Sequence, residues 1–317
     1  MQSQHMLKNR LFEYLRVKTS CRFSCSLRIN LKVNGLALFN SYLYKTRMNI
    51  IPLISRNWPF ANGSGRFVDK YATNIDLGTG ERTARTSDGF PMQVYADDLV
   101  GRHILMSGAF DRSISQVLLD HAKPNDVLLD IGANIGYVSA VFLTRVTGSK
   151  AVCIEPQPGI VDLLRKNMQQ FGDRAEVQQV GLAYEDGSLR FHVNTKNRGA
   201  SRISSDGEIE IQVIAADKVL ADLPRVDLIK VDVEGFEEPI FRSIEVQLNR
   251  LKPRAILFED QTGTAAPTGK IGSILIRCGY RLFGVDKRLL KTSLVPIAVP
   301  DDCRFNDYLA VYGSSST

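Results

Sequence analysis

The sequence has few cysteines and no long apolar run. The five cysteines among 317 residues are odd in number and irregularly spaced: Cys21, Cys25, Cys153, Cys278 and Cys303. This pattern fits neither a disulfide framework nor a tetrahedral zinc set, and it predicts reduced thiols in an intracellular, cytoplasmic protein. No apolar run reaches the roughly 18 residues that a membrane-spanning helix requires, so we expect no membrane span.

Acidic residues are scarce in the first 47 residues. This segment holds nine Lys and Arg residues against one acid, Glu13, which leaves 31 basic and 33 acidic residues in the remaining 270. The near-neutral remainder argues against a nucleic-acid-binding protein. A mitochondrial-type targeting segment and a nucleic-acid- or membrane-binding arm are alternatives for residues 1–47. We favour a disordered or non-native extension, with the working protein beginning near Met48.

Strand-like and helix-like segments alternate along most of the remaining chain. Residues 48–112, rich in turn formers between 62 and 89, predict a small N-terminal cap, and residues 113–317 a second domain. In that domain the pattern predicts strands at 127–130, 150–155, 176–183, 227–232 and 255–259, separated by helices at 137–146, 160–171, 238–251 and 270–278. This alternation predicts an α/β fold with a doubly wound, mostly parallel sheet.

Two further pairs of segments predict antiparallel pairing. Residues 188–193 and 208–213 both alternate between apolar and polar side chains, which predicts an inserted β-hairpin. Residues 280–285 and 308–312 predict an antiparallel pair that closes the sheet. The carboxyl ends of the parallel strands then share one edge, where ligands of such sheets bind.

A glycine-containing loop follows the first parallel strand. It reads Asp130-Ile131-Gly132-Ala133-Asn134-Ile135-Gly136, and a helix begins directly after it. Gly132 and Gly136 permit a tight turn and a close backbone approach to a ligand, and the helix directs free N–H groups at that ligand. Asn134 stands where G-x-G-x-x-G has its second glycine, and no G-x-x-x-x-G-K-[ST] motif is present. The loop therefore favours a nucleoside-like ligand over a dinucleotide or a triphosphate.

Three later strand ends complete this site. Glu155 can accept hydrogen bonds from a ribose diol. Gly181 and Leu182 offer small or apolar contacts to an adenine-sized ring. Lys230 and Asp232 come at the end of a fourth strand, beside the expected position of a reacting atom.

These motifs resemble the FkbM-type branch of the S-adenosylmethionine-dependent methyltransferases. The likeness rests on LDIGANIGY at 129–137, IEPQ at 154–157 and DLIKVDVEGFE at 227–237, with NRGAS at 197–201 as a weaker element. The resemblance implies a Rossmann-like fold with a seven-stranded type of sheet, S-adenosylmethionine as cofactor and methyl transfer to a hydroxyl oxygen. It implies that the amino-acid half of the cofactor contacts Asp130, Gly132, Asn134 and Gly136, and that Glu155 binds its ribose.

The catalytic and substrate-binding groups are less sharply indicated. Asp232 is a candidate for the methionine ammonium, the acceptor or the proton of a hydroxyl, with Lys230 two residues before it on the same strand face. His192, on the inserted hairpin, is the candidate histidine base. Asn197 and Ser201 lie on a loop over the strand edge and, with Asp111, are candidate substrate-binding residues.

The histidines show no metal-ligand spacing, so we expect a metal-free enzyme. A metal-assisted variant stays open, because Asp232, Glu234 and Glu259 could group at one edge of the sheet. The predicted function is S-adenosylmethionine-dependent O-methylation of a hydroxyl on a small molecule or a glycan. The alternatives are a nicotinamide nucleotide-dependent oxidoreductase and a non-enzymatic module that binds nucleic acid through the basic segment.

Overall fold

The computed structural model describes residues 50–195 and 197–313. The described residues from Ile51 onward form one compact unit, whereas the predicted extension at 1–47 lies outside the described residues. Within the described ranges, no helix combines the length and the apolar character needed to cross a bilayer. The three cysteines in these ranges, Cys153, Cys278 and Cys303, are free thiols.

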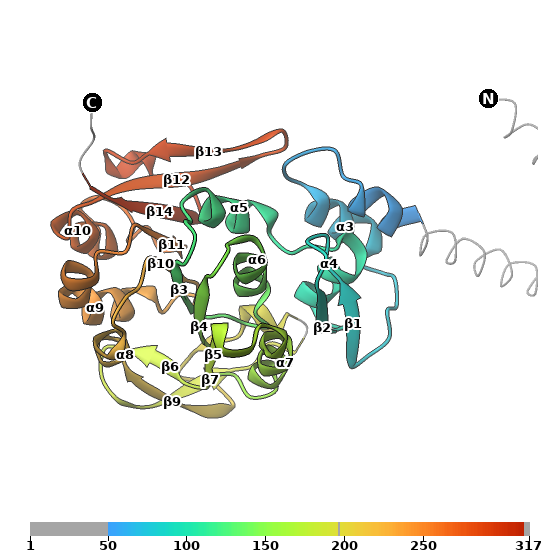
Figure 1. Cartoon of the computed structure of the whole chain (residues 1–317), viewed down its shortest axis with the longest axis horizontal. Coiled ribbons are helices and arrows are strands. Elements are labelled where there is room, and N and C mark those ends of the chain that lie inside the picture. The colour runs from blue at the N-terminus through green and yellow to red at the C-terminus, as the bar shows by residue number, and fades with distance from the viewer. Residues whose placement is uncertain (1–49, 196, 314–317) are drawn as a thin grey trace, which may run out of the picture. The chain divides into compact units, whose positions relative to one another are not determined.

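An eight-stranded sheet forms the centre of the molecule (Figure 1). Its strand order is β13-β12-β14-β11-β10-β3-β4-β5, and five neighbouring strands from β11 to β5 are parallel. The strands are β3 (Val127–Ile131), β4 (Lys150–Ile154), β5 (Ala175–Gln178), β10 (Leu228–Val231), β11 (Ala255–Glu259), β12 (Tyr280–Arg288), β13 (Lys291–Pro296) and β14 (Asp307–Tyr312). The predicted doubly wound, mostly parallel fold is confirmed.

Helices cover both faces of this sheet because its strands are apolar on both sides. Leu128 packs on one face into the hydrophobic core that α5, α6 and α7 share, whereas the next residue, Leu129, packs into the core shared with α8, α9 and α10. This period-two alternation is what a doubly wound sheet requires. The helices are α5 (Arg112–Asp120), α6 (Tyr137–Arg145), α7 (Ile160–Met168), α8 (Ala216–Asp222), α9 (Glu237–Leu251) and α10 (Lys270–Arg277).

The predicted terminal antiparallel pair is present, and it carries one strand more than expected. Strand β14 runs antiparallel to β11, and β12 pairs with β14. Beyond residue 285, β12 continues to Arg288 and turns back as β13, which gives eight strands in place of seven. The expected strand at 176–183 is two strands, since β5 ends at Gln178 and β6 (Gly181–Ala183) joins another sheet.

The predicted hairpin is part of a four-stranded inserted sheet. Strands β7 (Gly187–His192) and β9 (Ile209–Ala215) pair antiparallel as expected. Strand β6 and the short β8 (Arg202–Ile203) extend the pair, in the order β6-β9-β7-β8. This sheet brings Asn197, Arg198, Gly199 and Ser201 into the wall of the cavity described below.

The region before β3 is more regular than its turn-rich sequence predicts. It contains α3 (Ser64–Ala72), a hairpin of β1 (Glu81–Arg85) and β2 (Pro91–Tyr95), and α4 (Leu99–Ser107). Helix α3 and strand β1 thus lie inside the stretch 62–89 that is rich in turn formers. Asp98 begins α4 as its N-cap by accepting a hydrogen bond from the Val100 N–H, which positions the first turn of α4 at the cavity.

Candidate active site

One cavity lies at the carboxyl edge of the parallel strands, where the sequence predicts a site. Its volume is about 400 Å³. It is lined by residues from the ends of β3, β4, β10 and β11, from the inserted sheet, and from the N-terminal part of the chain. Most of the predicted site residues line it, namely Asp111, Gly132, Asn134, Glu155, Gly181, Leu182, Asn197, Ser201, Lys230 and Asp232.

The loop after β3 passes close to the loop after β10. Gly132 has φ = 78°, and a Cβ atom there would lie 1.8 Å from the carbonyl oxygen of Asp232. Only glycine fits at this contact. Asn134 has φ = 51°, a left-handed conformation that asparagine tolerates better than most residues. Asn134 thus adopts a left-handed conformation that glycine also takes readily.

Glu155 joins the loops after β3 and β4. Its Oε2 accepts the backbone N–H of Asn134 and its Oε1 accepts that of Gln157, both at 2.9 Å. The residue is buried, and burial raises the pKa of its carboxyl to about 7 despite both hydrogen bonds. Each carboxylate oxygen has a second acceptor position, so Glu155 retains the capacity to bind two hydroxyls in the cavity wall.

Lys230 is held between two carboxylates. It is the Cα partner of Asp130 in the parallel ladder, and its Nζ lies 3.3 Å from Oδ1 of Asp130 and 3.3 Å from Oδ2 of Asp232. It also donates to the carbonyl oxygen of Gly132 at 3.0 Å. Burial alone would lower the pKa of Lys230, but the charges of the two aspartates outweigh it and raise that pKa. Lys230 is therefore a fixed cation.

Three predicted site residues do not line the cavity. Asp130 is fully buried beneath it, where its Oδ2 accepts from Ser139. Gly136 packs α6 against α7, because a Cβ there would lie 2.6 Å from Leu164. His192 is on the wrong face of β7, since its neighbour Phe191 faces the cavity and strands alternate. Its Nδ1 is instead 2.8 Å from Glu208. None of these three residues lines the cavity, and their roles in cofactor binding and catalysis stay predictions.

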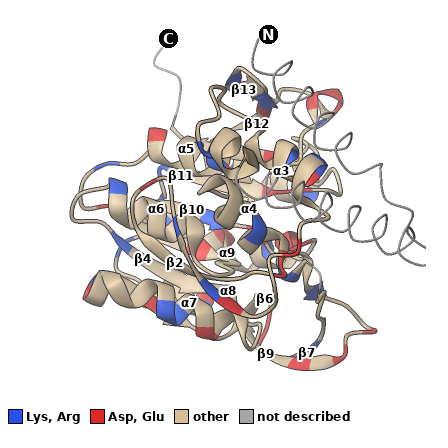
Figure 2. Ribbon diagram, turned by 90° about the vertical axis from the view of Figure 1, so that its right-hand side faces the viewer, with Lys and Arg blue, Asp and Glu red and all other residues tan. Residues whose placement is uncertain are grey.

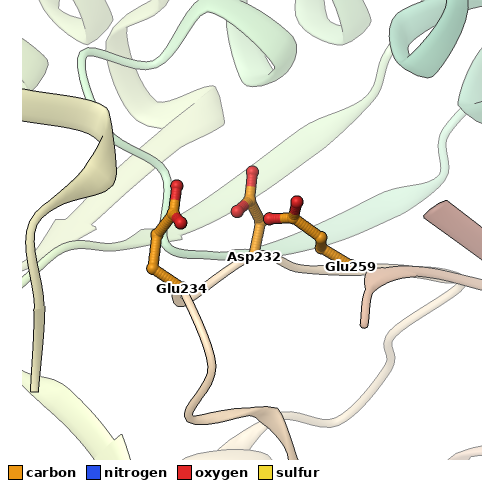
Figure 3. Close-up of side chains that lie close together, drawn as sticks. All are labelled: Asp232, Glu234 and Glu259. Atoms are coloured by element: carbon orange, nitrogen blue, oxygen red, sulfur yellow. The ribbon is translucent and has the colours of Figure 1, made fainter. Parts of the chain in front are cut away.

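Asp232, Glu234 and Glu259 converge at one end of the cavity (Figure 3). One carboxylate oxygen from each lies within 4.8 Å of the other two. Burial and the charge of Asp232 raise the pKa of Glu234 to about 7 and that of Glu259 to about 8. Three carboxylates this close do not all ionise readily, so the cluster retains protons near neutral pH.

Sequence reasoning missed a lysine between two further carboxylates. Lys287 Nζ lies 2.6 Å from Oδ2 of Asp111 and 2.8 Å from Oδ2 of Asp307. Asp307 is also the Cα partner of Glu259, because β14 begins antiparallel to the end of β11. An antiparallel last strand could have predicted this neighbour, whereas Lys287 lies beyond the expected end of its strand.

The segment after β7 forms another wall of the cavity. Asn194 N–H donates to Ser201 Oγ at 3.0 Å, and Asn197 N–H donates to Asn194 Oδ1 at 3.0 Å. The backbone N–H of Arg198 donates to Asp98 at 2.6 Å, which attaches this wall to the start of α4. Asn197 and Ser201 therefore lie where the sequence predicts substrate-binding residues.

Among the described residues that line this cavity, acidic side chains outnumber basic ones. The acids that line it are Asp111, Glu155, Asp232, Glu234, Glu259 and Asp307, and the bases are Arg198, Lys230 and Lys287. Elsewhere on the described chain, Lys and Arg are mixed with Asp and Glu along the elements in view (Figure 2). The cavity is thus suited to a ligand with positive charge or with several hydroxyls.

Comparison with known proteins identifies the domain that contains this cavity. Residues 130–282 match the family described as the methyltransferase FkbM domain. The resemblance that the motifs predict is confirmed over this part of the chain, which is similar to the methyltransferase FkbM domain.

Relatives with named activities cover part of the chain. The hexuronic acid methyltransferase AglP of Haloferax volcanii is 26% identical over 137 residues, 42% of this chain and 56% of its own length. The 2-O-methyltransferase NoeI of Sinorhizobium fredii is 25% identical over 160 residues, 44% of this chain and 65% of its own length. The matches thus span less than two thirds of either relative. The crystal structure of a methyltransferase FkbM from Methylobacillus flagellatus superimposes with a TM-score of 0.38 at 16% identity, covering 67% of this chain and 54% of that one.

Proposed function

We propose that this FkbM-type domain catalyses S-adenosylmethionine-dependent O-methylation of a hydroxyl on a small molecule or a glycan. The observation that carries the proposal is the cavity at the ends of β3, β4 and β10, in which the two loops joined by Glu155 adjoin the carboxylate of Asp232. The residues proposed to bind the nucleoside and the carboxylate proposed to act on the acceptor thus line the same cavity.

The described residues fit this cofactor. Gly132 and Asn134 would contact its amino-acid half, Glu155 its ribose hydroxyls, and Gly181 and Leu182 its adenine. Glu155 accepts two backbone N–H groups and keeps free acceptor positions, as a diol-binding carboxylate must. A 2′-phosphate would be repelled by Glu155, which argues against a phosphorylated nicotinamide nucleotide.

The acceptor would enter beside the acidic end of the cavity. The names of the two relatives support a polyhydroxylated acceptor, since one is a hexuronic acid methyltransferase and the other a 2-O-methyltransferase. Carboxylates such as Asp232 and Asp307 can accept hydrogen bonds from sugar hydroxyls, and Asn197 and Ser201 also line the cavity and can bind the acceptor.

S-adenosylmethionine supplies an electrophilic methyl group on a sulfonium sulfur. The chain's task is to hold the acceptor oxygen in line with that methyl group and to keep water out, which can supply up to about 7–11 kcal/mol. We propose that Asp232 orients the acceptor hydroxyl while Lys230 fixes the Asp232 carboxylate. The carboxylate cluster of Asp232, Glu234 and Glu259 would take up the proton that the hydroxyl releases.

Methyl transfer from labelled S-adenosylmethionine to fractionated host glycans and metabolites tests this function. We expect label in products that survive mild base, because methyl ethers resist it and methyl esters do not. Asp232→Asn should lower the rate at least about 100-fold, as expected for a positioned group in proton transfer. Label confined to base-labile products would contradict hydroxyl methylation.

A further inference from the structure

Among the described residues that line the cavity, Arg198 differs from the other two cations, Lys230 and Lys287. Lys230 and Lys287 each lie within 3.3 Å of two carboxylates. Arg198 contacts one carboxylate, with its Nη2 3.3 Å from Oδ2 of Asp97. Its Nη1 is buried and has no hydrogen-bond partner. Among the described residues around this cavity, Arg198 is thus the cation with unused hydrogen-bonding capacity.

The Arg198 side chain is held in place without using that capacity. Its guanidinium lies over the ring of Tyr95, 4.4 Å from the centroid. Its backbone N–H donates to Asp98. The side chain is 21% exposed and forms part of the cavity wall. A guanidinium fixed in this way is preorganised to bind a planar anion such as a carboxylate.

The neighbours of Arg198 indicate which part of a ligand it meets. A Cβ on the next residue, Gly199, would lie 3.2 Å from Nδ2 of Asn134 and 3.5 Å from Val100. Arg198 therefore adjoins the loop after β3, whereas the clustered acids Asp232 and Glu259 lie directly after β10 and at the last residue of β11. The loop after β3 is the one that we assign to the amino-acid half of the cofactor.

We propose that Arg198 binds the α-carboxylate of S-adenosylmethionine. This assignment rests on the proposed function. The described residues that line the cavity include six acids and three bases, so a carboxylate that enters needs a cation whose charge is not already shared between two acids. Among these described residues, Arg198 is that cation. The nucleoside half and the sulfonium, which carry no carboxylate, do not depend on it.

Calorimetry with two ligands that differ only in this carboxylate tests the assignment. The ligands are S-adenosylmethionine and decarboxylated S-adenosylmethionine, and the proteins are the full chain, Arg198→Gln and Arg198→Lys. We expect the full chain to prefer the carboxylated ligand at least tenfold, Arg198→Gln to lose this preference, and Arg198→Lys to keep part of it. Equal affinity of all three proteins for decarboxylated S-adenosylmethionine would show that the site stays folded.

Arg190→Gln is the matched control, because Arg190 is exposed on β7 outside the cavity. It should bind both ligands as the full chain does. An unchanged preference in Arg198→Gln would overturn the assignment. The assignment would also be overturned if Arg198→Gln bound S-adenosylmethionine with unchanged affinity but its S-adenosylhomocysteine complex bound glucuronate more weakly. Arg198 would then bind a carboxylate of the acceptor and not that of the cofactor. A full chain that binds neither ligand would overturn the proposed function itself and the assignment with it.

Discussion

The backbone N–H of Asn134 donates to Oε2 of Glu155 at 2.9 Å. This bond joins the loops after β3 and β4, and Oε1 of Glu155 fixes the start of the next segment at Gln157. One buried carboxylate thus sets the shape of the nucleoside end of the cavity and remains able to bind a diol there.

Glu155→Gln should therefore weaken S-adenosylhomocysteine binding by more than tenfold. The amide has one acceptor oxygen in place of two, so it cannot accept both backbone N–H groups and still receive two ribose hydroxyls. Calorimetry measures the loss. Glu176→Gln, an exposed residue on neighbouring β5, is the control and should bind normally. If Glu155→Gln and the unaltered chain bound S-adenosylhomocysteine with equal affinity, Glu155 would not contribute to cofactor binding.

Gly132→Ala should destabilise the fold by more than about 3 kcal/mol. The substitution adds left-handed backbone strain, about 1–2 kcal/mol, to a clash with the carbonyl oxygen of Asp232. Gly89→Ala is the matched control, because Gly89 has φ = 93° and open space around its would-be Cβ. Gly89→Ala should lower the free energy of unfolding only by the cost of the left-handed backbone strain. Urea unfolding measures both variants, and equal losses would show that the two loops separate easily.

Lys230→Met should lower the free energy of unfolding by about 3–5 kcal/mol. It leaves Asp130 fully buried with an uncompensated charge, which is the costly way to break a buried ion pair. The double variant Lys230→Met with Asp130→Asn should be more stable than Lys230→Met alone, because no buried charge is left without its partner. Chemical denaturation of the variants measures this coupling. Strictly additive losses would show that the pair does not interact.

Stability should fall as pH rises from about 5 to about 8.5, in part through Glu259. Burial raises the pKa of Glu259 from 4.5 to about 8 in the folded chain. Between these values the folded state binds more protons than the unfolded state, so the free energy of unfolding decreases as pH rises. Glu259→Gln should flatten this decline, whereas exposed Glu185→Gln should not. Unfolding midpoints measured across this pH range test the prediction. Parallel curves of midpoint against pH for Glu259→Gln and the unaltered chain would contradict it.

The sequence predicted the parallel strands and their helices well, because each is a short apolar run or a 3.6-residue pattern. It also placed Glu155 and Asp232 at the cavity, since residues at the carboxyl ends of neighbouring parallel strands must meet. The sequence did not predict which side chains of a strand point into the cavity. Asp130 and His192 lie on the right strands but point beneath the cavity and away from it.

The least predictable parts come from long-range contacts. Lys287 reaches Asp111 across 176 residues, and Arg198 reaches Asp97 and Asp98 across about one hundred. No local pattern encodes such pairs. The turn-rich sequence between 62 and 89 hides α3 and β1, whose apolar residues Val68 and Ala84 are buried only in the folded chain. The division into a cap at 48–112 and a domain at 113–317 stays a prediction.

Titration of the full chain with S-adenosylhomocysteine and, separately, with NAD is the most direct test of the central claim. The arrangement of Gly132, Asn134 and Glu155 around one cavity predicts saturable S-adenosylhomocysteine binding at one site per chain and no measurable heat with NAD. Tight NAD binding in the absence of S-adenosylhomocysteine binding would contradict the account and favour the oxidoreductase alternative.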